Sequence, residues 1–242
     1  MIAHRRHFVI LSAVFGIYWL ALAVDPYDRS DWALENALVV VAAALLFFSY
    51  KRLLLSRVSY TMIFVFMCLH VLGSHWTYSR VPYDEAFLAL TGASLNELVD
   101  WERNHYDRFV HLTYGLLLAY PIRELFLRIA NVRGFWGYFL PVVLTMASSM
   151  FYELVEWLAA EVFGSQLGMA FVGAQGDVWD AQKDMVLATL GALLAMAITL
   201  GINAWLQKDF AREWSESLKV KDNRPLGEDA VARIIEERKG SE

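Results

Sequence analysis

Long apolar segments and short polar connections alternate along the chain. A helix needs about 20 residues to cross the hydrocarbon layer of a bilayer, and six of the apolar segments approach or exceed that length. They lie near residues 8–24, 33–50, 58–78, 109–129, 135–160 and 182–206. This pattern predicts an all-α fold, a polytopic membrane protein with a six-helix transmembrane bundle over residues 1–207.

Composition supports this class of protein. The 242 residues are 57% hydrophobic and only 19% charged, which is too apolar for an ordinary soluble domain. The one cysteine, Cys68, lies inside an apolar segment, so the chain has no intrachain disulfide and a zinc–thiolate site is not expected. The net charge of −5 and the lack of a long basic run give no indication of a nucleic-acid partner.

Two regions outside the apolar segments are long enough to carry structure. The connection over residues 79–108 exceeds a simple turn, and Ser94 and Glu97 have the spacing of a helix capping box. We therefore expect an outer interfacial or re-entrant helix there, placed to act as a lid. Residues 208–242 form a charged tail that we expect to be solvated and cytoplasmic.

Basic residues in the short connections predict the orientation. The positive-inside rule places such connections in the cytoplasm, so both termini should be cytoplasmic and residues 79–108 should lie outside. The basic residues that decide this are Arg5, Arg6, Lys51, Arg52, Arg57, Arg123, Arg128 and Arg133.

Ionisable residues gather near the outer ends of four segments. Such groups cost several kcal/mol within a membrane unless they are paired, hydrated or bound to a metal. Helical spacing places Asp107 with His111, Glu153 with Glu156, and the three aspartates each on one helix face. The groups are His70 and His75; His105, Asp107 and His111; Glu153 and Glu156; and Asp177, Asp180 and Asp184.

A divalent cation would relieve the repulsion among these carboxylates. Histidine and carboxylate without thiolate suit zinc or manganese, and also iron or a two-metal site. Glu153 is our candidate general base, and Arg103 and Arg108 are candidates to stabilise developing charge. The candidate metal ligands are His70, His75, His111, Glu156, Asp177, Asp180 and Asp184.

Structural roles compete with each of these assignments. His70 could be a packed histidine bonded across helices, and His75 could simply be solvated at the interface. Glu153 and Glu156 could mark a helix end. Negative charge near a helix N-terminus is favourable, which accounts for Asp177 and Asp180 well but for Asp184 poorly.

Four sequence motifs resemble the YjdF-like family of bacterial inner-membrane proteins over roughly residues 8–206. They are HVLGSHWTY (70–78), ERNHYDRFVH (102–111), YELVEW (152–157) and QGDVWDAQKDM (175–185). The resemblance implies a multi-pass protein of the bacterial inner membrane and assigns no reaction. The last segment is also similar to VanZ-like membrane proteins in the spacing of Asp184 and Gly191, although Ala188 stands where that family tends to have Asn.

Three functions from different classes fit these observations. The preferred hypothesis is a metal-dependent hydrolase that acts on a membrane lipid or lipid-linked substrate from the outer side. The second is a transporter or channel with a proton or cation path. The third is a non-catalytic scaffold whose polar cluster fixes helix packing.

The predicted orientation is testable by cysteine labelling. With Cys68 replaced by serine, a cysteine introduced near residue 90 should react with an impermeant thiol reagent added to intact cells, because the basic connections hold the opposite side in the cytoplasm. Labelling that requires the inner face to be opened would reverse the orientation.

Overall fold

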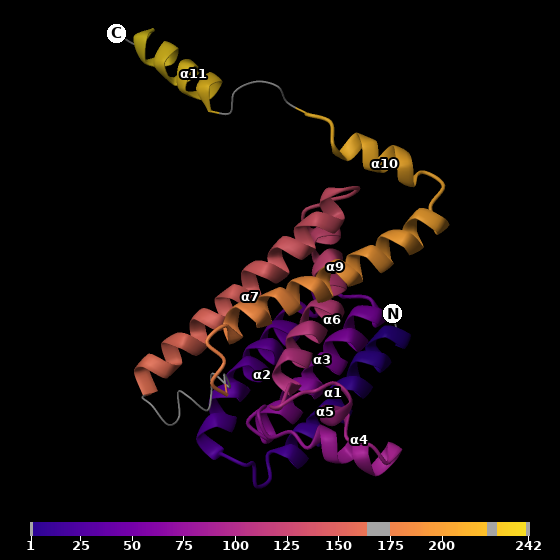
Figure 1. Cartoon of the computed structure of the whole chain (residues 1–242). Helices are drawn as coiled ribbons and strands as arrows, with labels where there is room; N and C mark the ends of the chain where they lie inside the picture. The colour runs from indigo at the N-terminus through magenta and orange to yellow at the C-terminus, as the bar shows by residue number, and fades with distance from the viewer. Residues whose placement is uncertain (1, 164–174, 222–226, 241–242) are drawn as a thin grey trace.

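The computed structural model describes residues 2–163, 175–221 and 227–240, and its regular elements in these ranges are all helices (Figure 1). The all-α prediction is confirmed. The helices are α1 (Ile2–Leu22), α2 (Arg29–Ser49), α3 (Arg57–His75), α4 (Tyr83–Thr91), α5 (Leu95–Leu98), α6 (Tyr106–Ile129), α7 (Trp136–Phe163), α9 (Asp180–Leu206), α10 (Phe210–Ser217) and α11 (Glu228–Lys239).

Each of the six predicted segments corresponds to one long helix. Within the described ranges, five of them, α1, α2, α3, α7 and α9, are long and apolar enough to cross a membrane. The sixth, α6, has 24 residues, about 36 Å of helix, but carries more charge. It packs against α3, α7 and α9, so its polar residues face other helices as well as solvent.

Helix α3 ends at His75, three residues earlier than predicted. The chain turns back there because Thr77 and Tyr78 both have positive φ, and the Tyr78 amide donates to the Gly73 carbonyl oxygen at 2.8 Å. A β-carbon at Gly73 would lie 2.7 Å from the Tyr78 ring. Glycine therefore lets Tyr78 fold against its own helix, where its hydroxyl reaches His70.

Short helices mark the two ends of the bundle (Figure 1). The predicted helix start at Ser94 is confirmed, because the Glu97 amide donates to Ser94 Oγ at 3.1 Å at the start of α5. The longer helix α4 beside it was not anticipated. We call this the α4–α5 end.

Helix α10 lies at the opposite end. We expected the whole tail to be solvated, but α10 packs against the bundle. Phe210 and Trp214 pack on a core cluster that includes Tyr138. The amides of Gly134 and Phe135, just before α7, donate to Glu213 Oε1 at 3.1 Å and Ser217 Oγ at 2.9 Å. The first part of the tail thus covers the start of α7.

Helices α6 and α9 meet backbone to backbone in the middle of the bundle. A β-carbon at Gly115 would lie 1.9 Å from the Ala188 carbonyl oxygen, and one at Gly191 would lie 2.1 Å from the Leu112 carbonyl oxygen. Small residues allow this approach between membrane helices. The spacing of Asp184, Ala188 and Gly191 therefore has a packing role along α9.

Alanine at Gly191 should destabilise the protein by about 1–3 kcal/mol or more, because its β-carbon must force α6 and α9 apart. Gly201 lies on the same helix with no atom within 4 Å of its β-carbon position. Gly201→Ala should therefore leave stability unchanged or raised. Thermal unfolding of the detergent-purified variants measures both, and equal melting temperatures would show that the close contact is not required.

Candidate functional site

Three helices bring ionisable side chains together at the α4–α5 end. Asp107 and His111 lie on the first turns of α6, Glu153 lies about three turns before the end of α7, and Asp184 lies on the second turn of α9. The i, i+4 spacing of Asp107 and His111 stacks them on one face of α6. We call these four residues the acidic cluster.

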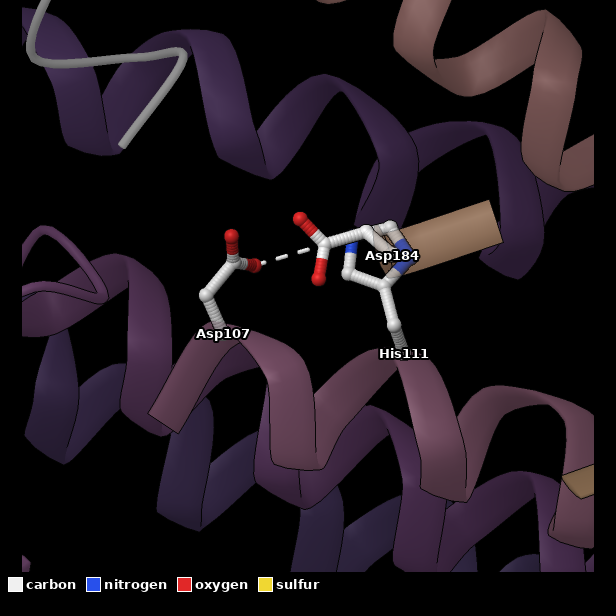
Figure 2. A group of neighbouring side chains, drawn as sticks. All are labelled: Asp107, His111 and Asp184. Atoms are coloured by element: carbon white, nitrogen blue, oxygen red, sulfur yellow. Dashed lines mark ion pairs between the residues drawn. The ribbon is translucent and has the colours of Figure 1, made fainter. Parts of the chain in front are cut away.

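Ligand atoms of Asp107, His111 and Asp184 all lie within 4.8 Å of one another (Figure 2). His111 Nε2 is 3.6 Å from Asp107 Oδ1 and 3.5 Å from Glu153 Oε1. Glu156 is buried one turn beyond Glu153 but is not a member of the three-residue group. The arrangement therefore places one imidazole nitrogen among three carboxylates from three helices.

The acidic cluster leaves buried oxygen atoms without hydrogen-bond partners. Asp184 is 2% exposed and Glu153 is 9% exposed. Asp184 Oδ1 and Glu153 Oε1 both lack a hydrogen-bond partner among the described residues. Because an unsatisfied buried carboxylate is costly, these atoms must be satisfied by a proton, by water or by a cation.

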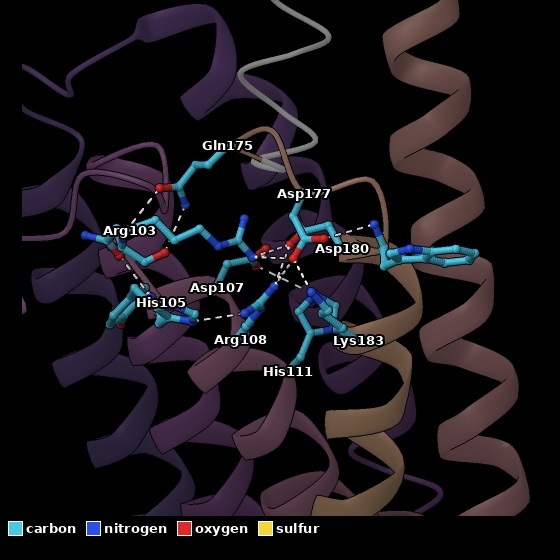
Figure 3. A network of polar contacts seen from close by, with 12 residues as sticks. Arg103, His105, Asp107, Arg108, His111, Gln175, Asp177, Asp180 and Lys183 are labelled. Atoms are coloured by element: carbon cyan, nitrogen blue, oxygen red, sulfur yellow. Dashed lines mark hydrogen bonds and ion pairs between the residues drawn. The ribbon is translucent and has the colours of Figure 1, made fainter. Parts of the chain in front are cut away.

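A ring of ion pairs surrounds Asp177 and Asp180 at the mouth of the acidic cluster (Figure 3). Arg103 Nη2 lies 2.5 Å from Asp180 Oδ1, and Lys183 Nζ lies 2.5 Å from Asp177 Oδ2. Arg108 Nη2 bonds to Asp177 and lies 3.4 Å from Asp180 Oδ1. Two carboxylates thus face three cations, and we call these five residues the ion-pair ring.

The ion-pair ring perturbs groups outside the membrane-spanning helices. Hydrogen bonds from the Lys183 ammonium and the Trp179 amide hold the pKa of Asp177 well below its usual value, and Arg108 adds to this effect. Burial lowers the pKa of His105, and the positive charges of Arg108 and Arg103 lower it further. Asp177 is therefore ionised and paired, and protonation of His105 is disfavoured.

The other two candidate ligands, His70 and His75, lie in hydrogen bonds that fix the fold. His70 Nε2 lies 3.1 Å from the Glu35 carbonyl oxygen, and its Nδ1 contacts the Tyr78 hydroxyl. Since a carbonyl only accepts, Nε2 donates and Nδ1 accepts from Tyr78. His75 Nδ1 donates to the Leu22 carbonyl oxygen at 2.8 Å, at the end of α1. Neither imidazole joins the acidic cluster.

Helix α2 contributes polar residues that we had not selected. Asp31, Glu35 and Asn36 are 1%, 3% and 4% exposed, and the Tyr152 hydroxyl on α7 donates to Glu35 Oε2 at 3.1 Å. The sequence could have indicated them, because polar residues at i, i+4 and i+5 near the end of an apolar segment are the same feature by which the other candidate site residues were selected. Asp107 also belongs to the acidic cluster, although it was not among the predicted ligands.

Asp177→Asn should lower the melting temperature near neutral pH, because the ion-pair ring stabilises the charged carboxylate. A depressed folded-state pKa contributes stability above the unfolded-state value and loses it as pH falls, so the difference from wild type should narrow below about pH 4. Asp209→Asn is the matched control, since Asp209 forms an exposed pair with Arg212 at 3.0 Å. If Asp177→Asn lowers the melting temperature no more than Asp209→Asn does, the ion-pair ring contributes little to stability.

Comparison with known proteins agrees with this architecture. The chain is 36% identical over 171 residues to the inner membrane protein YjdF of Escherichia coli (strain K12). The aligned region covers 70% of this chain and 78% of that protein. No solved structure matches. A family model described as predicted membrane protein matches residues 7–204. The chain is a multi-pass inner-membrane protein and belongs to this family, DUF2238.

Proposed function

We propose that the acidic cluster binds a divalent cation and that the protein uses it to hydrolyse a membrane lipid or lipid-linked substrate. The observation that supports this most directly is the convergence of Asp107, His111 and Asp184 within 4.8 Å, with Asp184 Oδ1 buried and unpartnered. A packing cluster would satisfy its own polar atoms. This one leaves Asp184 Oδ1 and Glu153 Oε1 without hydrogen bonds among the described residues.

The donor set and its spacing fit a small divalent cation. Ligands about 2.0–2.1 Å from a tetrahedral ion lie roughly 3.3–3.4 Å apart, close to the 3.6 Å that separates His111 Nε2 from Asp107 Oδ1. One imidazole with carboxylates suits zinc or manganese. Arg103, Arg108 and Lys183 already neutralise Asp177 and Asp180, so a cation would compensate the inner carboxylates.

The chain's own residues have distinct roles in this proposal. A divalent cation held by Asp107, His111 and Asp184 would supply Lewis acidity toward a substrate oxygen and a water molecule. Glu153, at the edge of the three-ligand group, accepts the proton from that water. Arg103 and Arg108 are held in place by Asp177 and Asp180, and their guanidinium groups stabilise negative charge at the mouth of the site. In this assignment, Asp177 and Asp180 position the arginines and are not ligands.

The orientation predicted from the basic connections places the reaction at the outer face. Both termini are then cytoplasmic, and the α4–α5 end meets the lipid headgroups of the outer leaflet. Burial of the acidic cluster near the starts of α6 and α9 keeps it within reach of the bond between a headgroup and its chain. This supports a substrate embedded in the membrane.

The close contact of α6 and α9 disfavours the transport hypothesis. Gly115 lies one turn inward from His111, and Gly191 lies two turns inward from Asp184. Backbone contact at these positions blocks a path between the two helices toward the α10 end. The cluster therefore resembles a site open at one end more than a channel.

The metal proposal predicts that purified protein holds a roughly stoichiometric divalent cation. Asp184→Asn should lose it while still inserting and folding, because the amide keeps the size and removes only the charge. A cation at 100 times its Kd stabilises the native state by about 2.7 kcal/mol, so chelation should lower the melting temperature of wild type and not of Asp184→Asn. Elemental analysis and thermal unfolding measure both effects.

Asp177→Asn provides the matched control, since it removes a carboxylate of the ion-pair ring and should keep the cation. Metal-free Asp184→Asn should also be at least as stable as metal-free wild type, because it relieves repulsion among the carboxylates. If wild type carries no metal, and added zinc or manganese changes the stability of neither protein, the packing or transport hypothesis replaces this one.

A further inference from the structure

A cavity of about 410 Å³ runs from the acidic cluster to the outer surface of the bundle between α2 and α7. Asp107 and His111 lie at its polar end, together with Glu35. Its remaining wall is largely apolar and includes Val41, Phe151 and Val155. The cavity thus joins the candidate site to a face that is apolar.

The apolar wall is open to the surroundings of the bundle. Val41 is 54% exposed, Phe151 is 67% exposed and Val155 is 39% exposed, although all three line the cavity. These residues lie on membrane-spanning helices, so the medium they face is the hydrocarbon of the bilayer. The cavity therefore opens sideways into the membrane.

The inner wall carries a buried hydroxyl group with no partner. Ser149 is 2% exposed, lines the cavity, and its Oγ makes no hydrogen bond to the described residues. Its neighbour Ser148 is bonded to the Tyr114 hydroxyl at 2.6 Å. Since buried hydroxyls are normally satisfied, Ser149 has bonding capacity for a molecule inside the cavity.

The polarity of the cavity matches that of a lipid in the leaflet at the α4–α5 end. Its carboxylates lie toward that end, and the cavity follows α6 inward from Asp107 to Tyr114, about 10 Å along the helix. A lipid of that leaflet has the same direction, with its polar group at the end and its chain toward the bilayer centre. The volume is within the range of a site for one small molecule, about 300–1,000 Å³.

We propose that this cavity admits one hydrocarbon chain of a membrane lipid sideways between α2 and α7, with the polar linkage of the lipid at Asp107 and His111. Ser149 donates a hydrogen bond to an oxygen of that linkage. The proposal gives the substrate of the proposed function a class, a chain-bearing lipid with an ester or phosphoryl linkage. Its catalytic meaning rests on the proposed function, but binding of the chain does not require a cation.

Photo-crosslinking in vesicles tests chain access. The full-length protein is reconstituted in phosphatidylcholine vesicles with a single-chain phospholipid that carries a diazirine on its chain, and the labelled residues are mapped by mass spectrometry. Label at Ser149 and Tyr114, inside the cavity, is the expected result. Label confined to exposed residues would overturn the proposal.

Two neighbouring positions on α2 provide a matched pair of variants. Val41 lines the cavity and Val40, 63% exposed, does not. Val41→Trp should fill the opening and lower label at Ser149 roughly tenfold, the change that about 1.4 kcal/mol of binding free energy produces. Val40→Trp should leave it unchanged. Equal label in the two variants would overturn the proposal.

Ser149→Ala separates substrate binding from folding. Removal of an unpartnered buried hydroxyl should not destabilise the protein, but it should weaken competition by unlabelled single-chain phospholipid at Tyr114. Unchanged competition would exclude the hydrogen bond assigned to Ser149.

Repeating the labelling after chelation distinguishes this proposal from the proposed function. Label at Ser149 that persists in protein without metal or hydrolytic activity would support the chain site and remove the hydrolase. If the protein binds metal and hydrolyses lipid but Ser149 is not labelled, the hydrolase proposal is supported and the chain site is excluded.

Discussion

The contact between α6 and α9 is the constraint on which the candidate site depends. Glycine at positions 115 and 191 lets the two backbones touch, and a side chain at either position would separate them. Because His111 and Asp184 lie only one and two turns from these glycines, their separation is set by the same contact. The chemistry at the α4–α5 end thus follows from packing in the middle of the membrane.

Charge compensation divides the carboxylates into two groups with different roles. Asp177 and Asp180 meet three cations in the ion-pair ring, which ties the loop before α9 to the start of α6. Within the inner cluster, His111 is the basic group at ion-pair distance from Asp107 and Glu153. Packing can replace ion pairs such as those of the ring, whereas the inner carboxylates are buried without an Arg or Lys at ion-pair distance among the described residues.

Sequence alone predicted much of this architecture, because apolar length and helical spacing are local properties. The six long segments and the gathering of ionisable residues at one end follow from them, but the membership of the acidic cluster does not, since His70 lies outside it and Asp107 was not among the predicted ligands. The division of roles does not follow from them either. Whether Asp180 binds a metal ion or pairs with Arg103 depends on how the connections before α6 and α9 fold. The pattern of residues along the sequence contains no information on that. The turn that brings Tyr78 back to His70 is another such case, since it depends on a close approach at Gly73.

Helix α2 shows how polar contacts can position a helix while leaving a gap beside it. Asn36 accepts a hydrogen bond from Trp19 Nε1 at 2.6 Å and donates to Ser74 Oγ at 3.3 Å, which ties α2 to α1 and α3. Its link to α7 is the hydrogen bond from Tyr152 to Glu35, near the α4–α5 end. Farther inward the two helices are separated by the cavity. A helix held by directional bonds at one end keeps its position without filling the space along its length, and that space leads to the acidic cluster.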